Sequence, residues 1–416
     1  MRSAVGDGIR VGADSVVRGC QSVSNAGSGI TIGGQHTTVR DCTINRNTIA
    51  GVHITGGTGS LVAANAACDN GVGLWFASGD NTCRENHVQG NTDNYDFAAG
   101  NKVEIRLSEI PESIDWPALV TLEGTLTGVA GQHGIDIRSG DVTIDLGGHS
   151  LVGVEGSLTG ITTTTTEHDG IEIRNGVVRD WGEAGIDIRG PSPFSNSEQR
   201  IADIRVLGNG GNGIRTGGRA LVTDCIAKDN IGYGIGVGNT SVVERCSAKD
   251  NGGHGISIFE RSIARTCVAE DNLGSGFSGY QASTFIDCSA GVNREHGFVG
   301  YRIIVLNCLA LANVENGIDM SDDCVAQHNR CISNTNGIQA VGDGNVIEAN
   351  LLRGNSAFGV TTNGMGNIVT CNTSVNDATA FQFMGNTVYG PIVNASGGGD
   401  LSTMTGGSHP GANIVR

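Results

Sequence analysis

Residues able to move protons recur at regular spacing in the middle of the chain. Two histidines, His254 and His296, lie two repeats apart, with Tyr280 between them and Asp319 after them. Imidazole, phenol and carboxylate groups are the usual general acids and bases of enzymes. We therefore predict these four side chains as catalytic residues for β-elimination or epimerisation of a sugar.

A second set of residues in the same stretch offers surfaces for sugar rings. Aromatic faces flanked by carboxylates and a cation are what a glycan groove needs. The predicted substrate-binding residues are Tyr233, Phe259, Glu260, Tyr301, Arg302 and Asp322. Phe259, Tyr280 and Tyr301 share one repeat position and would stack if that position faces solvent. Alternatively, the rings turn inward to fill the space beside Gly279 and Gly300, and the histidines only fill turns.

The element that positions these residues is a repeat of about 21 residues. The repeated sequence pattern is a Gly, an aliphatic residue, one residue of any type and usually a second aliphatic residue. The glycines are Gly8, Gly29, Gly51 and Gly73, and then Gly213, Gly234, Gly255, Gly276, Gly297, Gly317, Gly337 and Gly359. A coil this short holds two or three strands, each paired with the same strand of the next coil. One repeat position then becomes a column of side chains spaced ~4.8 Å apart.

Asparagine and cysteine form two further columns. A closing Asn recurs at 230, 251, 272, 293, 313, 334, 355 and 376. Because Asn tolerates turn geometry and its amide bonds to neighbouring backbone, we expect an amide ladder. Five residues earlier, Cys alternates with Asn: Cys20, Cys42, Asn65, Asn86, Cys225, Cys246, Cys267, Cys288, Cys308, Asn329, Asn350 and Cys371. This spacing favours free, buried thiols, although disulfides between adjacent coils stay open as the alternative. The sequence has no C-x-x-C pair, which argues against a metal site.

The composition agrees with a repeat architecture. The chain has 67 Gly and only 6 Pro in 416 residues, and aromatic residues make up 4%. This is too much Gly for an ordinary globular domain, and no collagen-like period accompanies it. We predict an all-β fold, a right-handed single-stranded parallel β-helix built as a solenoid of these coils.

The repeat is interrupted near residue 100, which indicates two modules. Residues 95–103 echo residues 381–388, and both stretches have the pattern of a last coil. We predict a partial module at 1–103, the C-terminal coils of one copy, and a complete module at 104–416. The second module would have a cap at 104–130 and a C-terminal tail at 388–416. Because Met1 falls within a coil, we expect an uncapped strand edge there that can self-associate.

Charge and hydropathy exclude several classes of partner. The formal net charge is −16 and no basic run is present, which argues against nucleic acid as a partner. No apolar run approaches the length of a membrane span. The first residues have no apolar segment typical of a secretion signal. No cofactor is evident, and Ca²⁺ stays open because a polyanionic ligand needs either a cation or an arginine cluster here.

Three segments carry a family resemblance. Residues 142–153, 170–182 and 390–413 resemble bacterial right-handed parallel β-helix repeat proteins, within the pectate-lyase-like fold superfamily. The resemblance covers 104–416, and 1–103 as a partial copy. It implies an extracellular or cell-surface protein with a polysaccharide or other glycan as partner. Relatives of this kind act as lyases, hydrolases or epimerases.

The hydrolase signature does not fit this chain. Gly253-His254-Gly255 resembles a motif of polygalacturonase-type hydrolases, which also need a preceding Asp-Asp pair and a later Arg-x-Lys. Here the Asp-Asp pair at 322–323 follows the motif, and Arg215 precedes it. The Asp-Pro-His motif of alginate epimerases is absent as well. We predict a polysaccharide lyase or epimerase-like protein with a glycan groove over coils 233–323. The alternative is a non-catalytic surface, adhesion or glycan-binding scaffold, and the residues leave open whether the protein is an enzyme.

Overall fold

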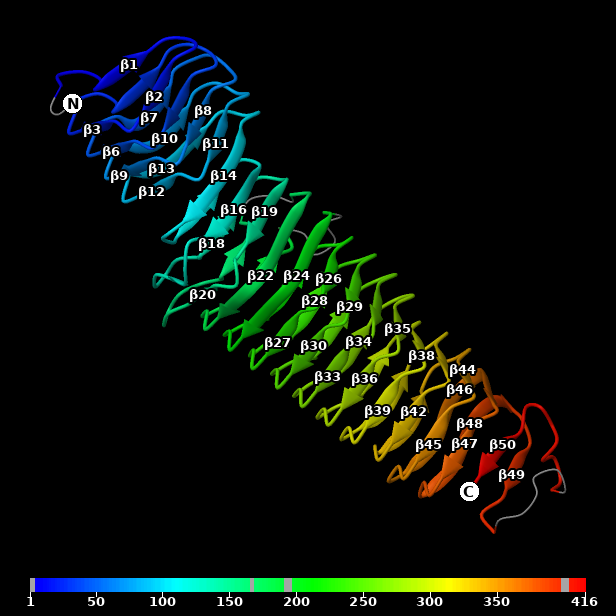
Figure 1. The fold of residues 1–416 in the computed structure, drawn as a ribbon. Helices are drawn as coiled ribbons and strands as arrows, with labels where there is room; N and C mark the ends of the chain where they lie inside the picture. Colours follow the sequence, from blue (N-terminus) through cyan, green and yellow to red (C-terminus); the bar gives the residue numbers. More distant parts are fainter. Residues whose placement is uncertain (1–3, 165–167, 191–196, 398–403) are drawn as a thin grey trace. The chain divides into compact units, whose positions relative to one another are not determined.

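The chain folds into stacked coils of β-strand. The computed structural model describes residues 4–164, 168–190, 197–397 and 404–416, so Met1 lies outside the described residues. Within these ranges every regular element is a β-strand, β1 to β50 (Figure 1). The strands group into two compact units. Unit 1 is Met1–Val152 with His168–Gly176, and unit 2 is Gly153–Glu167 with Val177–Arg416. The predicted all-β parallel solenoid is confirmed.

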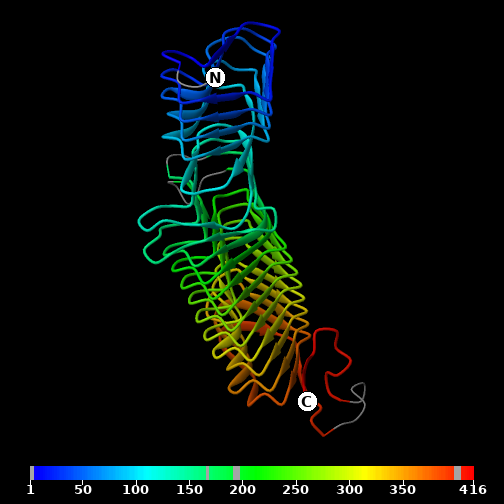
Figure 2. The ribbon, with the colours of Figure 1, turned by 60° about the vertical axis from the view of Figure 1, so that its left-hand side comes forward.

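Three short strands make one coil of unit 2. β28 (Ile235–Val237), β29 (Val242–Glu244) and β30 (Ser247–Lys249) form one coil. The next coil consists of β31 (Ile256–Ile258), β32 (Ile263–Arg265) and β33 (Val268–Glu270). Each strand pairs in parallel with its counterpart one coil on, as Ile235 does with Ile256. Figure 2 shows the coils of each unit stacked in this way.

The core of unit 2 comes from the alternation along these strands. Ile256 and Ile258 point inward and are fully buried, while Ser257 between them faces the other side of the sheet. Farther along, Phe277 and Phe298 stack inside with ring centroids 4.9 Å apart. The interior is therefore a set of columns of like side chains, as the repeat predicts.

An asparagine ladder runs through the turns, as predicted. The Asn251 amide donates to Oδ1 of Asn272 at 3.0 Å, and the Asn251 backbone N–H donates to the same oxygen at 3.1 Å. Each amide also reaches a carbonyl of the preceding coil. The ladder explains the repeat glycine, because a Cβ on Gly255 would lie 2.8 Å from the Asn272 amide nitrogen.

In the last coil, the predicted positions in the asparagine column and in the cysteine column are each wrong by one residue. Asn355 bonds to Asp377 rather than to Asn376, and Asn350 bonds to Asn372, so Cys371 is not in the column. Asn376 and Cys371 instead occupy left-handed backbone positions next to the ladder. The reason is one additional residue in the turn after Asn355, which shifts the ladder positions of the next coil by one residue.

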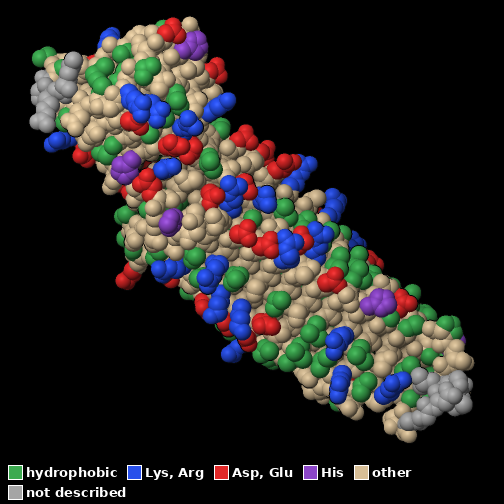
Figure 3. All heavy atoms as spheres, in the orientation of Figure 1, with side chains coloured by type: hydrophobic (Ala, Val, Ile, Leu, Met, Phe, Trp, Pro, Cys, Tyr) green, Lys and Arg blue, Asp and Glu red, His purple; other side chains and the backbone are tan. Residues whose placement is uncertain are grey.

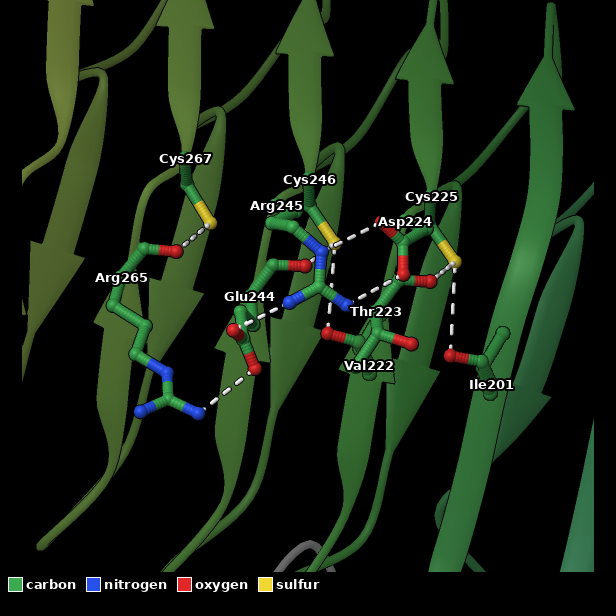
Figure 4. A network of polar contacts seen from close by, with 10 residues as sticks. All are labelled: Ile201, Val222, Thr223, Asp224, Cys225, Glu244, Arg245, Cys246, Arg265 and Cys267. Carbon is green, nitrogen blue, oxygen red and sulfur yellow. Dashed lines mark hydrogen bonds and ion pairs between the residues drawn. The ribbon is translucent and has the colours of Figure 1, made fainter.

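The cysteines are free thiols, as predicted, and most of them are buried. Figure 4 shows Cys225, Cys246 and Cys267 in one column on successive coils. Each thiol donates to the carbonyl two residues before it, as Cys225 does to Thr223 at 3.1 Å. Outside this column, Arg245 links Asp224 of the previous coil with Glu244 on the exposed surface.

Residues 102–122 continue the stack of unit 1. β14 (Lys102–Leu107) pairs with β11 (Thr82–Arg84) on one side and with β16 (Ala118–Leu122) on the other. The compact units divide near residue 153, and the module boundary at 103/104, with its cap at 104–130, stays a prediction. In unit 2, β50 (Asn413–Val415) pairs with β47 (Thr373–Val375) and β49 (Ile392–Asn394), so the tail returns to the last coil. The described residues contain no helix with the length and apolar character needed to cross a membrane.

Candidate functional site

The predicted site residues lie on both margins of one sheet in unit 2. This sheet contains β28, β31, β34 (Phe277–Gly279), β37 (Phe298–Gly300) and β40 (Asn316–Met320). Its outward positions hold mostly small residues: Gly236, Ser257, Ser278, Val299 and Asp319. Ser257 and Ser278 are only 3% and 8% exposed although they face outward. Larger side chains on the two margins therefore overhang the middle of this face.

The first margin brings Tyr233 and His254 together. Their rings stack with centroids 5.2 Å apart and planes 25° apart. Nδ1 of His254 accepts the backbone N–H of Ser275 at 3.0 Å, so the proton of the neutral ring is on Nε2. Burial lowers the pKa of His254, against the opposing effect of the Glu295 carboxylate 3.9 Å away. His254 is thus a neutral donor through Nε2 rather than a ready base.

His296 forms a similar contact two coils on. Its Nδ1 accepts the backbone N–H of Asn316 at 3.3 Å, and its Nε2 lies 3.0 Å from Glu315 and 3.9 Å from Asp319. The structure therefore brings together His296 and Asp319, both predicted as catalytic. Sequence reasoning missed Glu295 and Glu315, which stand one position before the column that it followed.

The two histidines share a structural role with asparagines of the same column. Oδ1 of Asn212 accepts the N–H of Tyr233 at 2.8 Å, and Oδ1 of Asn336 accepts the N–H of Phe358 at 3.3 Å. Nδ1 of each histidine makes the equivalent bond to the following coil. That nitrogen therefore supports the turn, and Nε2 is the atom left for chemistry.

The second margin carries the predicted ring column. Phe259 and Tyr280 stack with centroids 5.0 Å apart and planes 11° apart, and Tyr280 is 50% exposed. The inward alternative is therefore wrong for Tyr280. The space beside Gly279 and Gly300 is filled by Phe285 and Ile303, whose atoms come within 2.9 and 2.6 Å of the absent Cβ positions.

The remaining predicted binding residues surround this column. The Arg302 guanidinium lies 4.9 Å from the centre of the Tyr301 ring and also pairs with Asp323 at 3.3 Å. Asp322 accepts the backbone N–H of Asp343 at 2.9 Å, so its carboxylate holds the turn of the next coil. Glu260 is half-buried at the turn after β31.

The two margins are too far apart to form one catalytic centre. His254 and Phe259 stand on either side of β31, and at ~3.3 Å per residue this separates the columns by roughly 15 Å. Tyr280 therefore does not lie with His254. The tyrosine beside His254 is Tyr233, which we predicted only as a binding residue.

An arginine completes the group at Tyr233. Arg215, on β25 (Ile214–Thr216), is the register partner of Gly236. The missing side chain at Gly236 leaves a space bordered by Arg215 Cγ and Tyr233 Cδ2, at 3.9 and 4.0 Å. Burial lowers the pKa of Arg215, and within the described ranges its guanidinium forms no ion pair. Asp187 on the preceding coil is already paired with Arg189 at 2.8 Å.

Several solved structures have a similar fold. The A-module of mannuronan C-5 epimerase AlgE6 of Azotobacter vinelandii is 15% identical, with a TM-score of 0.52, over 71% of this chain and 91% of that one. The A-module of AlgE4 of the same organism is 16% identical, with a TM-score of 0.49, over 70% and 91%. Pectate lyase Pel9A is 15% identical, with a TM-score of 0.36, over 65% and 69%. At these identities the likeness concerns the fold.

The sequence comparisons place the chain in a family. No curated protein matches it at a significant level. The family profile described as right handed beta helix region matches residues 2–110 and 159–302, more than half of the chain. This match agrees with the predicted right-handed sense of the coils. The chain therefore belongs to the right-handed β-helix family.

Proposed function

We propose that unit 2 acts on a uronate-containing polysaccharide, by β-elimination or C5 epimerisation, over coils 233–323. The observation that carries this proposal is the stacked Tyr233–His254 pair beside unpaired Arg215, above the open position of Gly236. A cation for the sugar carboxylate, a phenol and a neutral imidazole N–H are the three groups that proton abstraction beside a carboxylate needs.

The proposed chemistry assigns one role to each of these groups. Arg215 pairs with the uronate carboxylate, which makes the C5–H bond more acidic. After the Tyr233 hydroxyl has released its proton to solvent, its oxygen takes the C5 proton, and Nε2–H of His254 donates a hydrogen bond to the charge that develops on the carboxylate. In elimination the C5 electron pair forms the C4–C5 double bond, the C4–O4 bond breaks, and Tyr233 gives the abstracted proton to O4. In epimerisation a solvent proton reaches the opposite face of C5, and Tyr233 releases the abstracted proton to solvent.

The rest of the face would hold neighbouring sugar residues. The exposed Phe259–Tyr280 stack offers a flat apolar surface along the coil axis, and Arg302 over Tyr301 adds a cation. Nε2 of His296 already contacts the Glu315 and Asp319 carboxylates. We therefore assign these three side chains to contacts with sugar hydroxyls rather than to proton transfer. We also propose an extracellular or cell-surface location, where such a polysaccharide is met.

A non-catalytic glycan-binding scaffold is the second candidate. The observation that favours it is the equivalence of His254 and His296 with Asn212 and Asn336, which shows that the column serves the turns of the solenoid. In this alternative the aromatic margin binds glycan and no bond is broken.

The test is an assay on polymannuronate, polyguluronate and polygalacturonate. Elimination is followed by ultraviolet absorbance of the unsaturated product, and epimerisation by deuterium entering C5 in D₂O. We expect activity that Tyr233→Phe abolishes and that His254→Asn lowers while keeping the bond to Ser275. Tyr389→Phe, on an exposed tyrosine away from this face, is the matched control. Full activity in Tyr233→Phe contradicts the assignment, and silence across the panel with folded protein favours the scaffold.

Calcium is tested in the same assay. Within the described part of the chain, no group of three or more His, Cys, Asp or Glu side chains is arranged to hold a metal ion. We therefore propose that Arg215, not Ca²⁺, neutralises the uronate. Activity should survive a chelator, and its loss on chelation with recovery by Ca²⁺ would contradict that role.

A further inference from the structure

One of the three sheets of unit 1 is interrupted, and a pocket opens at the break. β13 (Asp93–Phe97) is the last strand of the sheet β1–β4–β7–β10–β13. The corresponding strand of the next coil, β15 (Glu112–Ile114), pairs only forward, with β18 (Ile135–Ile137). The cavity has a volume of about 530 Å³ and is lined by residues of β13, β15 and their turns. This is within the usual range of ligand pockets.

Aromatic side chains, one of them with an unsatisfied polar atom, form one wall. The Trp116 ring packs edge-on against Phe97 at 5.0 Å and against Tyr95 at 6.4 Å. The Trp116 indole N–H is buried with no hydrogen-bond partner. Tyr95, which is only 7% exposed, also lines the pocket. Buried donors in folded proteins are normally paired, so the unpaired indole N–H at this pocket indicates a ligand that pairs it.

Two carboxyl groups also line the pocket. Glu109 accepts the backbone N–H of Gly90 at 2.9 Å and the Asn94 amide at 3.4 Å. The same amide nitrogen donates to Glu112 at 3.4 Å, so the two carboxyl groups lie on either side of Asn94. They provide acceptors for hydroxyl groups, while Tyr95 and Trp116 provide donors.

Charge limits the class of ligand. Asp93, Glu109, Glu112 and Asp115 line the pocket, and Arg138, 4.0 Å from Asp115, is the basic residue among the lining residues. A uronate carboxylate would be repelled. The described residues hold no metal-binding cluster here, so a bridging cation has no site.

We propose that the pocket at the break between β13 and β15 binds a neutral sugar residue, with Tyr95 and Trp116 against the ring and Glu109 and Glu112 accepting its hydroxyls. Aromatic faces take the apolar face of a sugar, and the surrounding donors and acceptors take its hydroxyls. This site is separate from the face of unit 2, and the two proposals do not depend on each other.

The test is calorimetric titration of the full chain with cellopentaose, maltopentaose, mannopentaose and xylopentaose, with pentagalacturonate as the charged comparison. We expect at least one neutral oligosaccharide to bind, and the charged one to bind at least about ten-fold more weakly. Tyr95→Phe keeps the ring and removes one hydroxyl, so it should weaken binding about five-fold. Trp116→Phe and Glu109→Gln should weaken it similarly, and Tyr389→Phe should leave it unchanged.

Three results would overturn the proposal. The first is no binding across the neutral panel. The second is wild-type affinity for the neutral sugar in Tyr95→Phe, Trp116→Phe and Glu109→Gln alike. The third is tighter binding of pentagalacturonate than of the neutral sugars, if Tyr95→Phe weakens it. Glu109 is only partly buried, so Glu109→Gln remains informative if Trp116→Phe does not fold. Tyr233→Phe should bind the neutral sugar normally, and Tyr95→Phe should retain any activity on uronates, so the two proposals can fail separately.

Discussion

At the scale of single residues, His254 has a structural nitrogen and a free one. Nδ1 supports the backbone N–H of fully buried Ser275, and Nε2 is directed away from that bond. Two coils earlier, the side-chain oxygen of Asn212 accepts a backbone N–H of the following coil in the same way. The substitution His254→Asn should therefore keep the hydrogen bond that supports the turn while it removes the imidazole ring.

We expect His254→Ala to lower the free energy of unfolding by about 2 kcal/mol, because it leaves a buried N–H without an acceptor. His254→Asn should cost less than half as much, since its Oδ1 can accept from Ser275 as Asn212 does from Tyr233. Both variants lose the Tyr233 ring contact, so the difference isolates the hydrogen bond. Urea unfolding followed by circular dichroism measures it, and equal losses in the two variants would contradict the supporting role.

Glu112 gives unit 1 a dependence on pH. Burial raises the pKa of Glu112 to about 7, and the Glu109, Asp115 and Asp93 carboxylates add to this against the Asn94 hydrogen bond. The folded chain therefore keeps a proton that the unfolded chain, with a carboxyl pKa near 4.5, releases. The stability from this group is highest below about pH 4.5 and falls as pH rises, until it levels off above about pH 7.

Between pH 5 and pH 8 this titration should lower the stability of unit 1 by roughly 2 kcal/mol. Glu112→Gln cannot ionise, so its unfolding should depend less on pH over that range. Thermal melts of the two proteins at both pH values provide the measurement. If the wild-type protein, compared with Glu112→Gln, were more stable at pH 8 than at pH 5, the predicted direction of the pH dependence would be wrong.

At the scale of elements, the asparagine ladder connects successive coils through buried amides. Asn272 accepts both the amide and the backbone N–H of Asn251 and donates to Asn293 and to the Ala248 carbonyl. Removing one member therefore leaves several buried polar groups unpaired. Because the glycine column packs against these amides, a larger residue cannot enter without moving the next coil.

We expect Asn272→Ala to destabilise unit 2 by about 3 kcal/mol. The matched control is Asn363→Ala, because Asn363 is exposed and lies in the extended backbone of β46 (Phe358–Thr370). The control should change stability by less than about 0.5 kcal/mol. Urea unfolding of both variants decides the point, and similar losses would mean that the ladder is not a main source of stability.

The burial of most cysteines in this chain predicts low thiol reactivity. Burial raises the pKa of Cys83 to about 12, and Cys246 and Cys267 are buried on their coils. Only Cys20, Cys68 and Cys371 are partly exposed. Because the thiolate is the reactive form, alkylation of the native protein at neutral pH should reach only these three residues, as mass spectrometry would show. Rapid labelling of Cys246 in native protein would contradict the burial.

The coil could be predicted from the sequence because one spacing governs strand, turn and ladder together. The same spacing located the sheet that carries the candidate residues. It also placed Tyr233 and His254 at the same repeat position on adjacent coils, but we assigned the catalytic role to Tyr280, whose column lies on the other margin. It also missed the shift in the last coil, where a single added turn residue moves Asn372 and Asp377 into the ladder. The interruption of the repeat near residue 100 indicates the break after β13, but it carries no signal for the pocket that opens there.

At the scale of the whole molecule, net charge acts on the two proposed ligands in different ways. The chain carries a formal charge of −16, and on the face shown in Figure 3 acidic and basic side chains are interspersed. A polyuronate must approach against this average repulsion and gains from Arg215 only at contact. Added salt screens the long-range repulsion more than the contact.

We therefore expect KM for the polyuronate to fall when ionic strength rises from about 0.01 M to about 0.15 M, which shortens the Debye length from roughly 30 Å to roughly 8 Å. A neutral pentasaccharide carries no charge to screen, so its Kd at the β13–β15 pocket should not change. Steady-state kinetics and calorimetry over the same salt series make the comparison. A KM that rises with salt would mean that local cations such as Arg215 and Arg302 outweigh the net charge, and the uronate would then be steered to this face rather than repelled from it.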